Sequence, residues 1–303
     1  MKKTLAPSVT ARDPKGLKFS SIVEAAYNKE GLSEEEAQRV NDTPGLADLI
    51  STFIGENRLS SKFKNEETSS NYGYLSGYKP KGLNEQCNRL RILFPGGLGF
   101  PNQDLLAQIE KDEVELPANA EGWFAIPNWM KNPNIFGTTY SEAVQKMLDT
   151  INSVRKGKFE NYRKGLIDEK HLRQSARSVE FWKQLSEAQG NPDILIVSAQ
   201  FGLRHRGRSV RRAIEIMKDA RGEFGLGAFA AGIMVLTHPE RLEHCDDLWI
   251  DCAGDEFDIP ESGVRFALAP CLGFYGGDVG FGTGWVGYTD DDYGSASGFV
   301  PQN

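Results

Sequence analysis

Apolar residues recur at intervals of three and four in several stretches of the chain, a spacing that places them on one face of an α-helix. The first stripe follows Thr43, a capping residue that precedes a proline at the first helical position. Ser33 and Glu36 have the spacing of a capping box, which predicts another helix start. Two longer helices are predicted over residues 139–154, again opened by a capping box, and 168–189. The apolar stripe of the helix after Thr43 is Leu46, Leu49, Ile50, Phe53 and Ile54. The stripe of helix 139–154 is Val144, Met147, Leu148, Ile151 and Val154, and that of helix 168–189 is Leu172, Ala176, Val179, Trp182 and Leu185.

Other apolar runs are short and bounded by turn residues, which favours strands. We predict strands over residues 89–97, 121–127, 193–200 and 247–254. In the third of these, apolarity is continuous rather than alternating, which indicates a central strand covered on both faces. The apolar run 224–236 has 13 residues, fewer than the ~20 that a membrane-spanning helix needs, so we interpret it as a buried helix.

The order of these elements predicts an α/β or α+β fold in which helices flank a mixed sheet. We place a helical lead-in and linker at residues 1–80 and the core domain at 81–271. Residues 272–303 contain nine glycines and seven aromatic residues, and they are interpreted as a β extension packed on the core. Within that extension, a hairpin is predicted to turn at Gly276 and Gly277, with another short strand at 284–288.

The composition of the chain is typical of a globular protein. The chain has 303 residues, of which 39% are hydrophobic and 25% are charged, enough for a large core with a solvated surface. Pro7 interrupts the apolar run at the N-terminus before a secretory segment can form. The four cysteines show no CxxC pair, which suits a reducing compartment. We therefore expect a soluble cytoplasmic protein that does not bind membranes.

The strongest chemical signal is the stretch from Arg204 to Arg212, which holds five arginines and a histidine although the net charge of the chain is −7. It follows the predicted central strand, and Ser209 is placed to cap the next helix, with Arg211 and Arg212 facing outward. Unpaired N–H groups at a helix N-terminus and the planar forks of arginine both favour oxyanions.

The hypothesis is that this loop binds a phosphate-bearing ligand, a nucleotide or a nucleic acid. The negative net charge argues against extended binding to a duplex and favours a local site. The predicted ligand-binding residues are Arg204, His205, Arg206, Arg208, Ser209, Arg211 and Arg212.

An alternative keeps these arginines inside the protein. Nine acidic residues lie between positions 240 and 261, and they could neutralise the arginines in an internal salt-bridge network. The chain would then be a non-enzymatic structural protein or would present a charged surface to a protein partner. The sequence leaves open whether the protein is an enzyme.

The acidic turn after the last predicted core strand suggests a metal. Asp251, Asp255 and Glu256 offer the oxygen ligands that Mg²⁺ and Mn²⁺ prefer. If this strand and strand 193–200 are parallel neighbours, metal and arginine loop would share one cleft, which could support metal-dependent hydrolysis.

Two further groups carry weaker signals. His238, His244, Cys245 and Cys252 have zinc-competent atoms, but their spacing is not that of a typical zinc site. Aromatic residues of the C-terminal extension lie beside Asp278 and residues 290–292 and could stack on sugar rings or bases, although packing on the core is the favoured interpretation. These aromatic residues are Phe274, Tyr275, Phe281, Trp285, Tyr288 and Tyr293.

Overall fold

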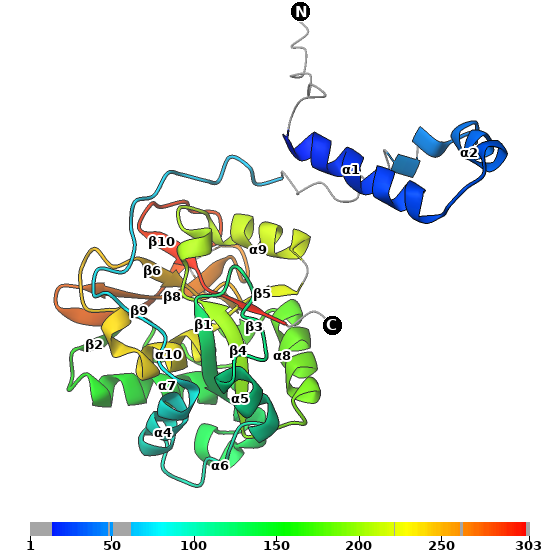
Figure 1. Ribbon diagram of the computed structural model, residues 1–303. Coiled ribbons are helices and arrows are strands. Elements are labelled where there is room, and N and C mark those ends of the chain that lie inside the picture. Colours follow the sequence, from blue (N-terminus) through cyan, green and yellow to red (C-terminus); the bar gives the residue numbers. More distant parts are fainter. Residues whose placement is uncertain (1–13, 48, 51–61, 221, 261–262, 301–303) are drawn as a thin grey trace, which may run out of the picture. The chain divides into compact units, whose positions relative to one another are not determined.

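The computed structural model describes residues 14–47, 49–50, 62–220, 222–260 and 263–300 (Figure 1). The chain divides into two compact units, residues 1–58 and 59–303. In the first unit, α1 spans Pro14–Lys29 and α2 spans Glu34–Asn41. The predicted capping box at Ser33 is confirmed. Positions 46, 47, 49 and 50 are helical, and the rest of the stripe up to Ile54 lies outside the described residues.

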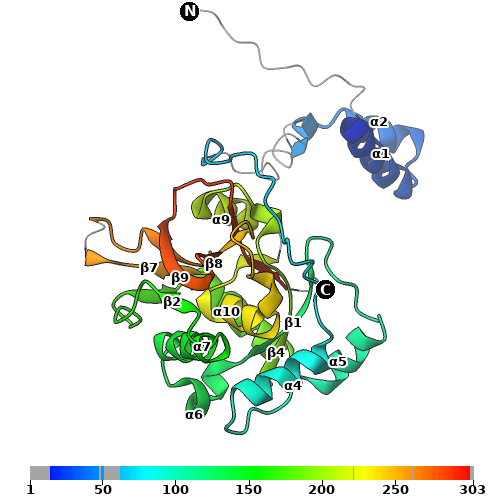
Figure 2. The same ribbon diagram turned by 90° about the vertical axis from the view of Figure 1, so that its left-hand side faces the viewer.

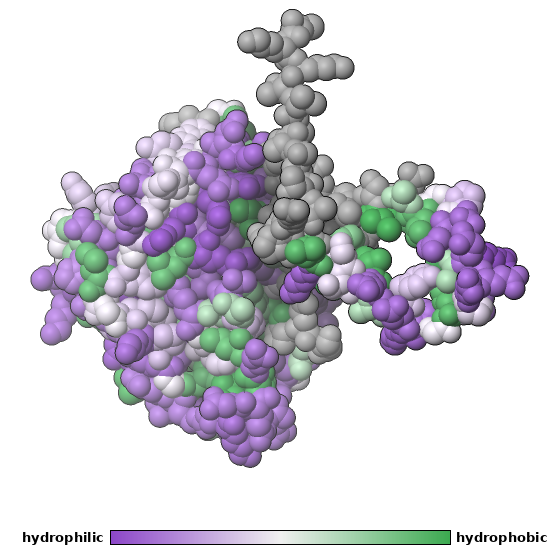
Figure 3. Space-filling model, turned by 45° about the horizontal axis from the view of Figure 1, so that its top comes forward, coloured by the Kyte–Doolittle hydropathy of each residue, from purple (hydrophilic) through white to green (hydrophobic). Residues whose placement is uncertain are grey.

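The first unit has no core of its own in its described part, because none of the side chains described there is buried. Figure 3 shows hydrophobic side chains on its surface. The large exposed ones are Leu17, Ile22, Val23, Val40 and Leu49.

The second unit contains the buried core and two sheets, an α+β arrangement in which helices flank the sheets, as the sequence predicts. Its helices are α4 (Leu83–Leu93), α5 (Gln103–Glu110), α6 (Pro133–Phe136), α7 (Tyr140–Val154), α8 (Ala176–Ala188), α9 (Val210–Asp219) and α10 (Ala228–Thr237), with short 3-10 helices at Trp129–Lys131, Leu203–His205 and Pro239–Arg241. In the part of the chain that the structure describes, no helix combines the length and the apolar character needed to cross a membrane.

Within the described residues, the first sheet has four antiparallel strands in the order β1-β4-β11-β5. All seven residues of β4 are buried, which confirms the prediction of a strand covered on both faces. The strand next to it, β11, comes from the C-terminal region of the sequence. The bounds are β1 (Gly122–Pro127), β4 (Ile194–Gln200), β11 (Ser297–Phe299) and β5 (Glu223–Gly225).

The second sheet is mixed and has the order β10-β6-β8-β7-β3, with β9 pairing β8 on one side and β2 on the other. Most pairs are antiparallel, but β10 runs parallel to β6 and β2 runs parallel to β9. The predicted hairpin between β8 and β9 is confirmed, and Gly276 and Gly277 both have positive φ at its turn. The bounds are β10 (Tyr293–Ser295), β6 (Trp249–Asp251), β8 (Leu268–Tyr275), β7 (Asp255–Phe257), β3 (Leu172–Gln174), β9 (Asp278–Trp285) and β2 (Phe159–Asn161).

The two sheets share α10, which contacts β1 of the first sheet and β8 of the second. Every residue of α10 is buried, as expected for a helix that is apolar all round. It also packs against α7, and the two helices lie side by side in Figure 2. Gly232 permits this contact, because a Cβ atom there would overlap the sulfur of Met147.

Several predicted elements differ from the observed ones. The predicted strand 89–97 is instead the second half of α4 and the following turn, and Leu83, Cys87 and Leu90 form its buried helical stripe. The predicted helix 168–189 begins only after Ser175, which caps α8, because Leu172 belongs to β3. The apolar run 224–236 begins as β5 and becomes helical at Ala228.

Candidate functional site

The arginine-rich loop connects β4 to α9, as predicted, and its first half binds Glu223. Arg204 Nε donates to both Glu223 oxygens at 2.9 and 3.0 Å, and His205 Nε2 lies 2.8 Å from Oε1. Burial alone would raise the pKa of Glu223, but the bonds from His205 and Arg204 hold this pKa at about 2. Burial lowers the pKa of His205, while the hydrogen bond to Glu223 and its charge act in the opposite direction.

The second half of the loop binds another segment of the chain, residues 62–81, which we call the strap segment. The predicted cap is confirmed, since Ser209 accepts a bond from the backbone of Arg212, and the Ser209 hydroxyl donates to Glu66 at 2.6 Å. Arg211 Nε donates to the two oxygens of the same carboxylate at 2.8 and 2.7 Å. Glu66 therefore sits where an external oxyanion was predicted, and its bond from Arg211 lowers its pKa.

The remaining arginines also have partners within the chain. Arg208 and Arg212 both form ion pairs with Glu67, and Arg212 additionally donates to Glu215 at 2.7 Å. The prediction that Arg212 faces outward is wrong, because this residue is only 8% exposed and packs between the two carboxylates. Arg206 is exposed and donates to the Tyr72 carbonyl at 2.8 Å.

The carboxylates that contact the loop are those of residues 66, 67, 215 and 223. In the described residues, none of the loop's ion pairs involves the acidic segment 240–261, so the predicted source of the neutralising acids is wrong. The reason is topological. The strap segment passes directly over the loop, with bridges that pair Glu67 with Arg208 and the Thr68 N–H with the Gly207 carbonyl.

The three residues predicted to bind metal occupy separate places. Asp255 accepts bonds from the Tyr140 hydroxyl at 2.8 Å and from the Ala228 backbone at 2.7 Å, so it anchors the start of α10. Glu256 pairs with Arg173. Asp251 lies apart from both in a pocket described below.

The premise of a shared cleft between parallel neighbouring strands is also wrong. The strand before the arginine loop, β4, belongs to the first sheet, whereas β6, which ends at Asp251, belongs to the second. The neighbours of β6 are β10 and β8.

A different group of side chains surrounds a pocket of about 290 Å³, which we call the acidic pocket. It lies where the N-terminus of α9 meets β6, the end of β9 and the connection from β9 to β10. Two of its residues, Asp251 and Asp290, are acidic and three are aromatic. The lining residues are Val210, Asp251, Gly284, Trp285, Tyr288, Asp290 and Tyr293.

Asp251 is the unusual group in this pocket. Its side chain lines the pocket although the residue is only 5% exposed. In the part of the chain described by the structure, no hydrogen bond or ion pair reaches its carboxyl group. Burial raises the pKa of Asp251 to about 7, and the nearby charge of Asp292 acts in the same direction. A buried acid without a partner is costly, and such groups are concentrated at functional sites.

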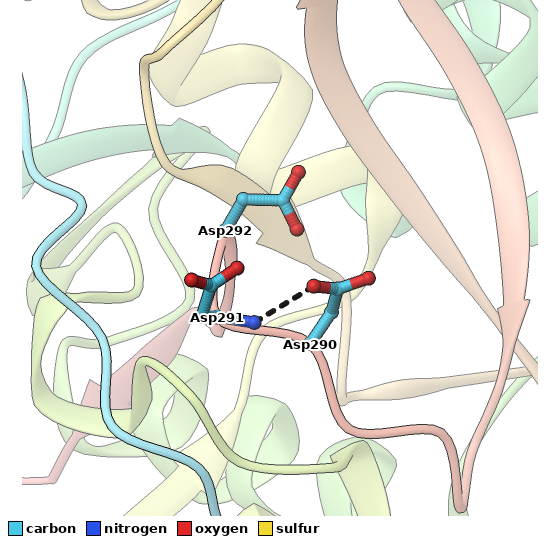
Figure 4. A group of neighbouring side chains, drawn as sticks. All are labelled: Asp290, Asp291 and Asp292. Atoms are coloured by element: carbon cyan, nitrogen blue, oxygen red, sulfur yellow. Dashed lines mark hydrogen bonds between the residues drawn. The ribbon is translucent and has the colours of Figure 1, made fainter.

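Asp290 belongs to a run of three aspartates beside the pocket (Figure 4). Among the residues that the structure describes, Asp290, Asp291 and Asp292 form the one group of three acids whose ligating atoms lie within 4.8 Å of one another. Oδ1 of Asp292 is buried and has no hydrogen-bond partner in the structure. Burial and the charge of Asp290 raise the pKa of Asp292 to about 6.

The base of the pocket is built by pairing between β6 and β10. Asp251 lies opposite Ser295 in register, and Trp249 lies opposite Tyr293, so all four side chains share one face of the sheet. The rings of Trp249 and Tyr293 stack with their centroids 5.1 Å apart. The buried Ser295 hydroxyl also has no partner in the structure.

From the sequence, Asp251 is a candidate metal ligand, and the aromatic residues are interpreted chiefly as packing on the core, with stacking on a ligand as the alternative; no pattern in the sequence places the two together. Comparison with protein-family models, curated proteins and solved structures gives no match, so function is inferred from the site alone.

Proposed function

We propose that the unit formed by residues 59–303 binds a cationic ligand in the acidic pocket. The observation that supports this proposal is the distribution of unpaired charge. The arginines of the loop are engaged by carboxylates or a carbonyl of the chain, whereas Asp251, Asp290, Asp291 and Asp292 take part in no ion pair among the described residues. Among the described residues, the charged groups that line this pocket are therefore acids without an ion pair.

The charges around the pocket favour a cation over an anion. Among the residues that the structure describes, no lysine or arginine lines the pocket, so no lining cation compensates the negative potential of its carboxylates. Beyond the effect of burial, Asp290 and Asp291 raise the pKa of Asp292, and Asp292 raises the pKa of Asp251, so the folded protein holds the carboxylates of residues 251 and 292 at a cost. A bound cation would relieve both the repulsion among the acids and the desolvation of Asp251.

The proposal is tested by calorimetric titration of the full chain with cations and anions of similar size. We expect heat of binding from cations, with an affinity that falls as salt rises. Replacing Asp290→Asn and Asp292→Asn together should weaken binding about tenfold, equivalent to about 1.4 kcal/mol. The matched control is Asp104→Asn with Asp112→Asn, which removes the same charge at two exposed positions outside the pocket. Binding of anions alone, or equal effects of the two double variants, would contradict the proposal.

The phosphate-binding hypothesis for the arginine loop stays a prediction, and it now requires that the ligand displace Glu66 and Glu67. Nucleotide and oligonucleotide titrations across a salt series test it, with Arg206→Glu and Arg208→Glu as the informative double variant. Binding that this variant abolishes would support the phosphate hypothesis. A lack of binding favours the alternative, in which the arginines hold the strap segment in place and the protein acts through a non-enzymatic interaction.

A further inference from the structure

We propose that the cation is an alkylated ammonium group, held against the rings of Trp285, Tyr288 and Tyr293 with Asp251 and Asp290 as its counter-ions. This inference rests on the proposed function and names the class of ligand. It combines two independent features of the acidic pocket, its exposed aromatic rings and its buried carboxyl group without a partner.

The aromatic residues distinguish an organic cation from a metal ion. Tyr288 and Trp285 are 65% and 49% exposed, although aromatic rings of this size are usually packed away from water. The negative faces of such rings attract ammonium groups that carry little bound water, and aromatic cages for quaternary ammonium ions use this effect. A hydrated Mg²⁺ ion prefers oxygen ligands and would gain little from three rings.

The placement of the acids also favours an organic cation. Asp251 and Asp290 both line the pocket, but Asp251 is not part of the compact group formed by residues 290–292. The pocket carboxyl groups are thus distributed around its wall instead of being gathered within coordination distance of one ion. Its volume of about 290 Å³ is near the lower end of the range for small organic ligands, roughly 300–1,000 Å³.

Asp251 supplies the second feature. It is nine-tenths buried, faces the pocket and lacks a partner among the described residues. An ammonium head group inserted between the rings would place a positive charge beside this carboxyl group and make its ionised form favourable. Because burial raises the pKa of Asp251 to about 7, binding at pH 6 should release a proton.

The test uses the full chain and three probes that carry the same head group: tetramethylammonium, choline and Nε-trimethyllysine. The neutral control is 3,3-dimethyl-1-butanol, which has the shape of choline without its charge, and Ca²⁺ and Mn²⁺ represent metals. Calorimetry measures affinity, and titrations in buffers of different ionisation enthalpy measure proton release. We expect at least one ammonium probe to bind more than tenfold tighter than the neutral control. At pH 6, the buffer should take up the proton that Asp251 releases on binding.

Variants show whether the binding occurs in the acidic pocket. Tyr288→Leu and Trp285→Leu should each weaken ammonium binding, by roughly threefold to thirtyfold for one cation–π contact. Tyr275→Leu is the matched control, because Tyr275 is 72% exposed at the tip of the β8–β9 hairpin and does not line the pocket. Equal effects of the pocket variants and Tyr275→Leu would overturn the inference.

The outcomes separate the two proposals. If Ca²⁺ or Mn²⁺ binds in a manner that needs Asp290 and Asp292 while all three ammonium probes fail, the proposed function stands and the ammonium inference is overturned. Equal affinity for choline and 3,3-dimethyl-1-butanol also overturns the inference, because the pocket would then recognise shape and not charge. If neither metals nor ammonium probes bind, both proposals are overturned.

Discussion

At the scale of single residues, three buried acids of this protein, Glu223, Asp251 and Asp255, fall into two classes. Glu223 is bonded to Arg204 and His205, and these bonds hold its pKa at about 2. Asp251 and Asp255 are buried without a cationic partner, and burial raises the pKa of each to about 7. The two classes give opposite contributions to the pH dependence of folding.

The first prediction concerns Asp251→Asn. Between about pH 4 and pH 7 the folded protein keeps a proton on Asp251 that the unfolded chain releases, so this group's contribution to stability is lost as pH rises through that window. Each unit of pKa difference corresponds to about 1.4 kcal/mol. We therefore expect the free energy of unfolding of the wild type to fall more steeply than that of the variant between pH 5 and pH 8 in urea titrations. Parallel curves would contradict this, and Asp104→Asn serves as the exposed control.

The second prediction concerns the floor of the acidic pocket. A Cβ atom at Gly273 would overlap the ring of Trp249, whereas a Cβ atom at Gly284 would meet no atom within 4 Å. Gly273→Ala should therefore lower the free energy of unfolding by about 1–3 kcal/mol, the usual cost of overpacking. Gly284→Ala should have a much smaller effect in the same denaturation experiment. A loss at Gly273→Ala as small as that at Gly284→Ala would contradict this and show that the Trp249 ring can move aside without cost.

At the scale of elements, the first part of the strap segment is attached through polar groups of the arginine loop and of α9. Glu66 and Glu67 bind Ser209, Arg208, Arg211 and Arg212, and the backbone of Lys62 and Phe63 donates to Glu215. These contacts give hydrogen-bond and ion-pair partners to the capping residue of α9, Ser209, and to the partly buried arginines. Loss of the two carboxylates would remove these ion pairs and the bond from the Ser209 hydroxyl.

The third prediction follows from these contacts. Glu66→Gln together with Glu67→Gln should destabilise the protein by about 1–2 kcal/mol, since several of the pairs are partly exposed to water and screened. Detachment of the strap should also increase protease cleavage within residues 62–75. The control is Glu113→Gln with Glu115→Gln, two exposed acids that form no ion pair among the described residues. Unchanged cleavage would mean that the backbone contacts alone fix the strap.

The elements that could be predicted from the sequence are those with local signals. The capping oxygens at Ser33, Thr139 and Ser209 and the apolar strand β4 carry their information within a few residues. The helix α4 differs from the predicted strand because its buried stripe begins at Leu83, before the apolar run that resembles a strand.

The site was harder to predict than the elements. The arginines are recognisable in the sequence, but their partners lie far away, and Glu66 and Arg211 are 145 positions apart. Asp251 meets Tyr293 only through the pairing of two short strands, which no local pattern specifies. Long-range contacts of this kind decide which charges remain available for a ligand.

At the scale of the whole molecule, the two units differ in how they are stabilised. Every buried hydrophobic side chain among the described residues belongs to residues 83–299, and the helices α1 and α2 bury none. The fourth prediction is that a fragment of residues 59–303 unfolds cooperatively within about 3 °C of the full chain, since a shift of this size corresponds to about 1 kcal/mol in a domain of this length. Calorimetry of both proteins measures this. A fragment that melts early or fails to fold would show that residues 1–58 support the core.

The position of β11 has a consequence for synthesis on the ribosome. Gln200 in β4 hydrogen-bonds Ser297, a residue made 97 positions later, and β11 also supplies the neighbour of β5. At roughly 5–20 residues per second, the nascent chain therefore carries β4, a strand that is fully buried in the folded protein, with one backbone edge unpaired for about 5–20 s. Such edges promote aggregation, so we expect this protein to depend on holding chaperones during translation more than its folded stability would suggest. A premature stop codon a few residues before β11 should give an aggregating product, although it removes only a small part of the chain.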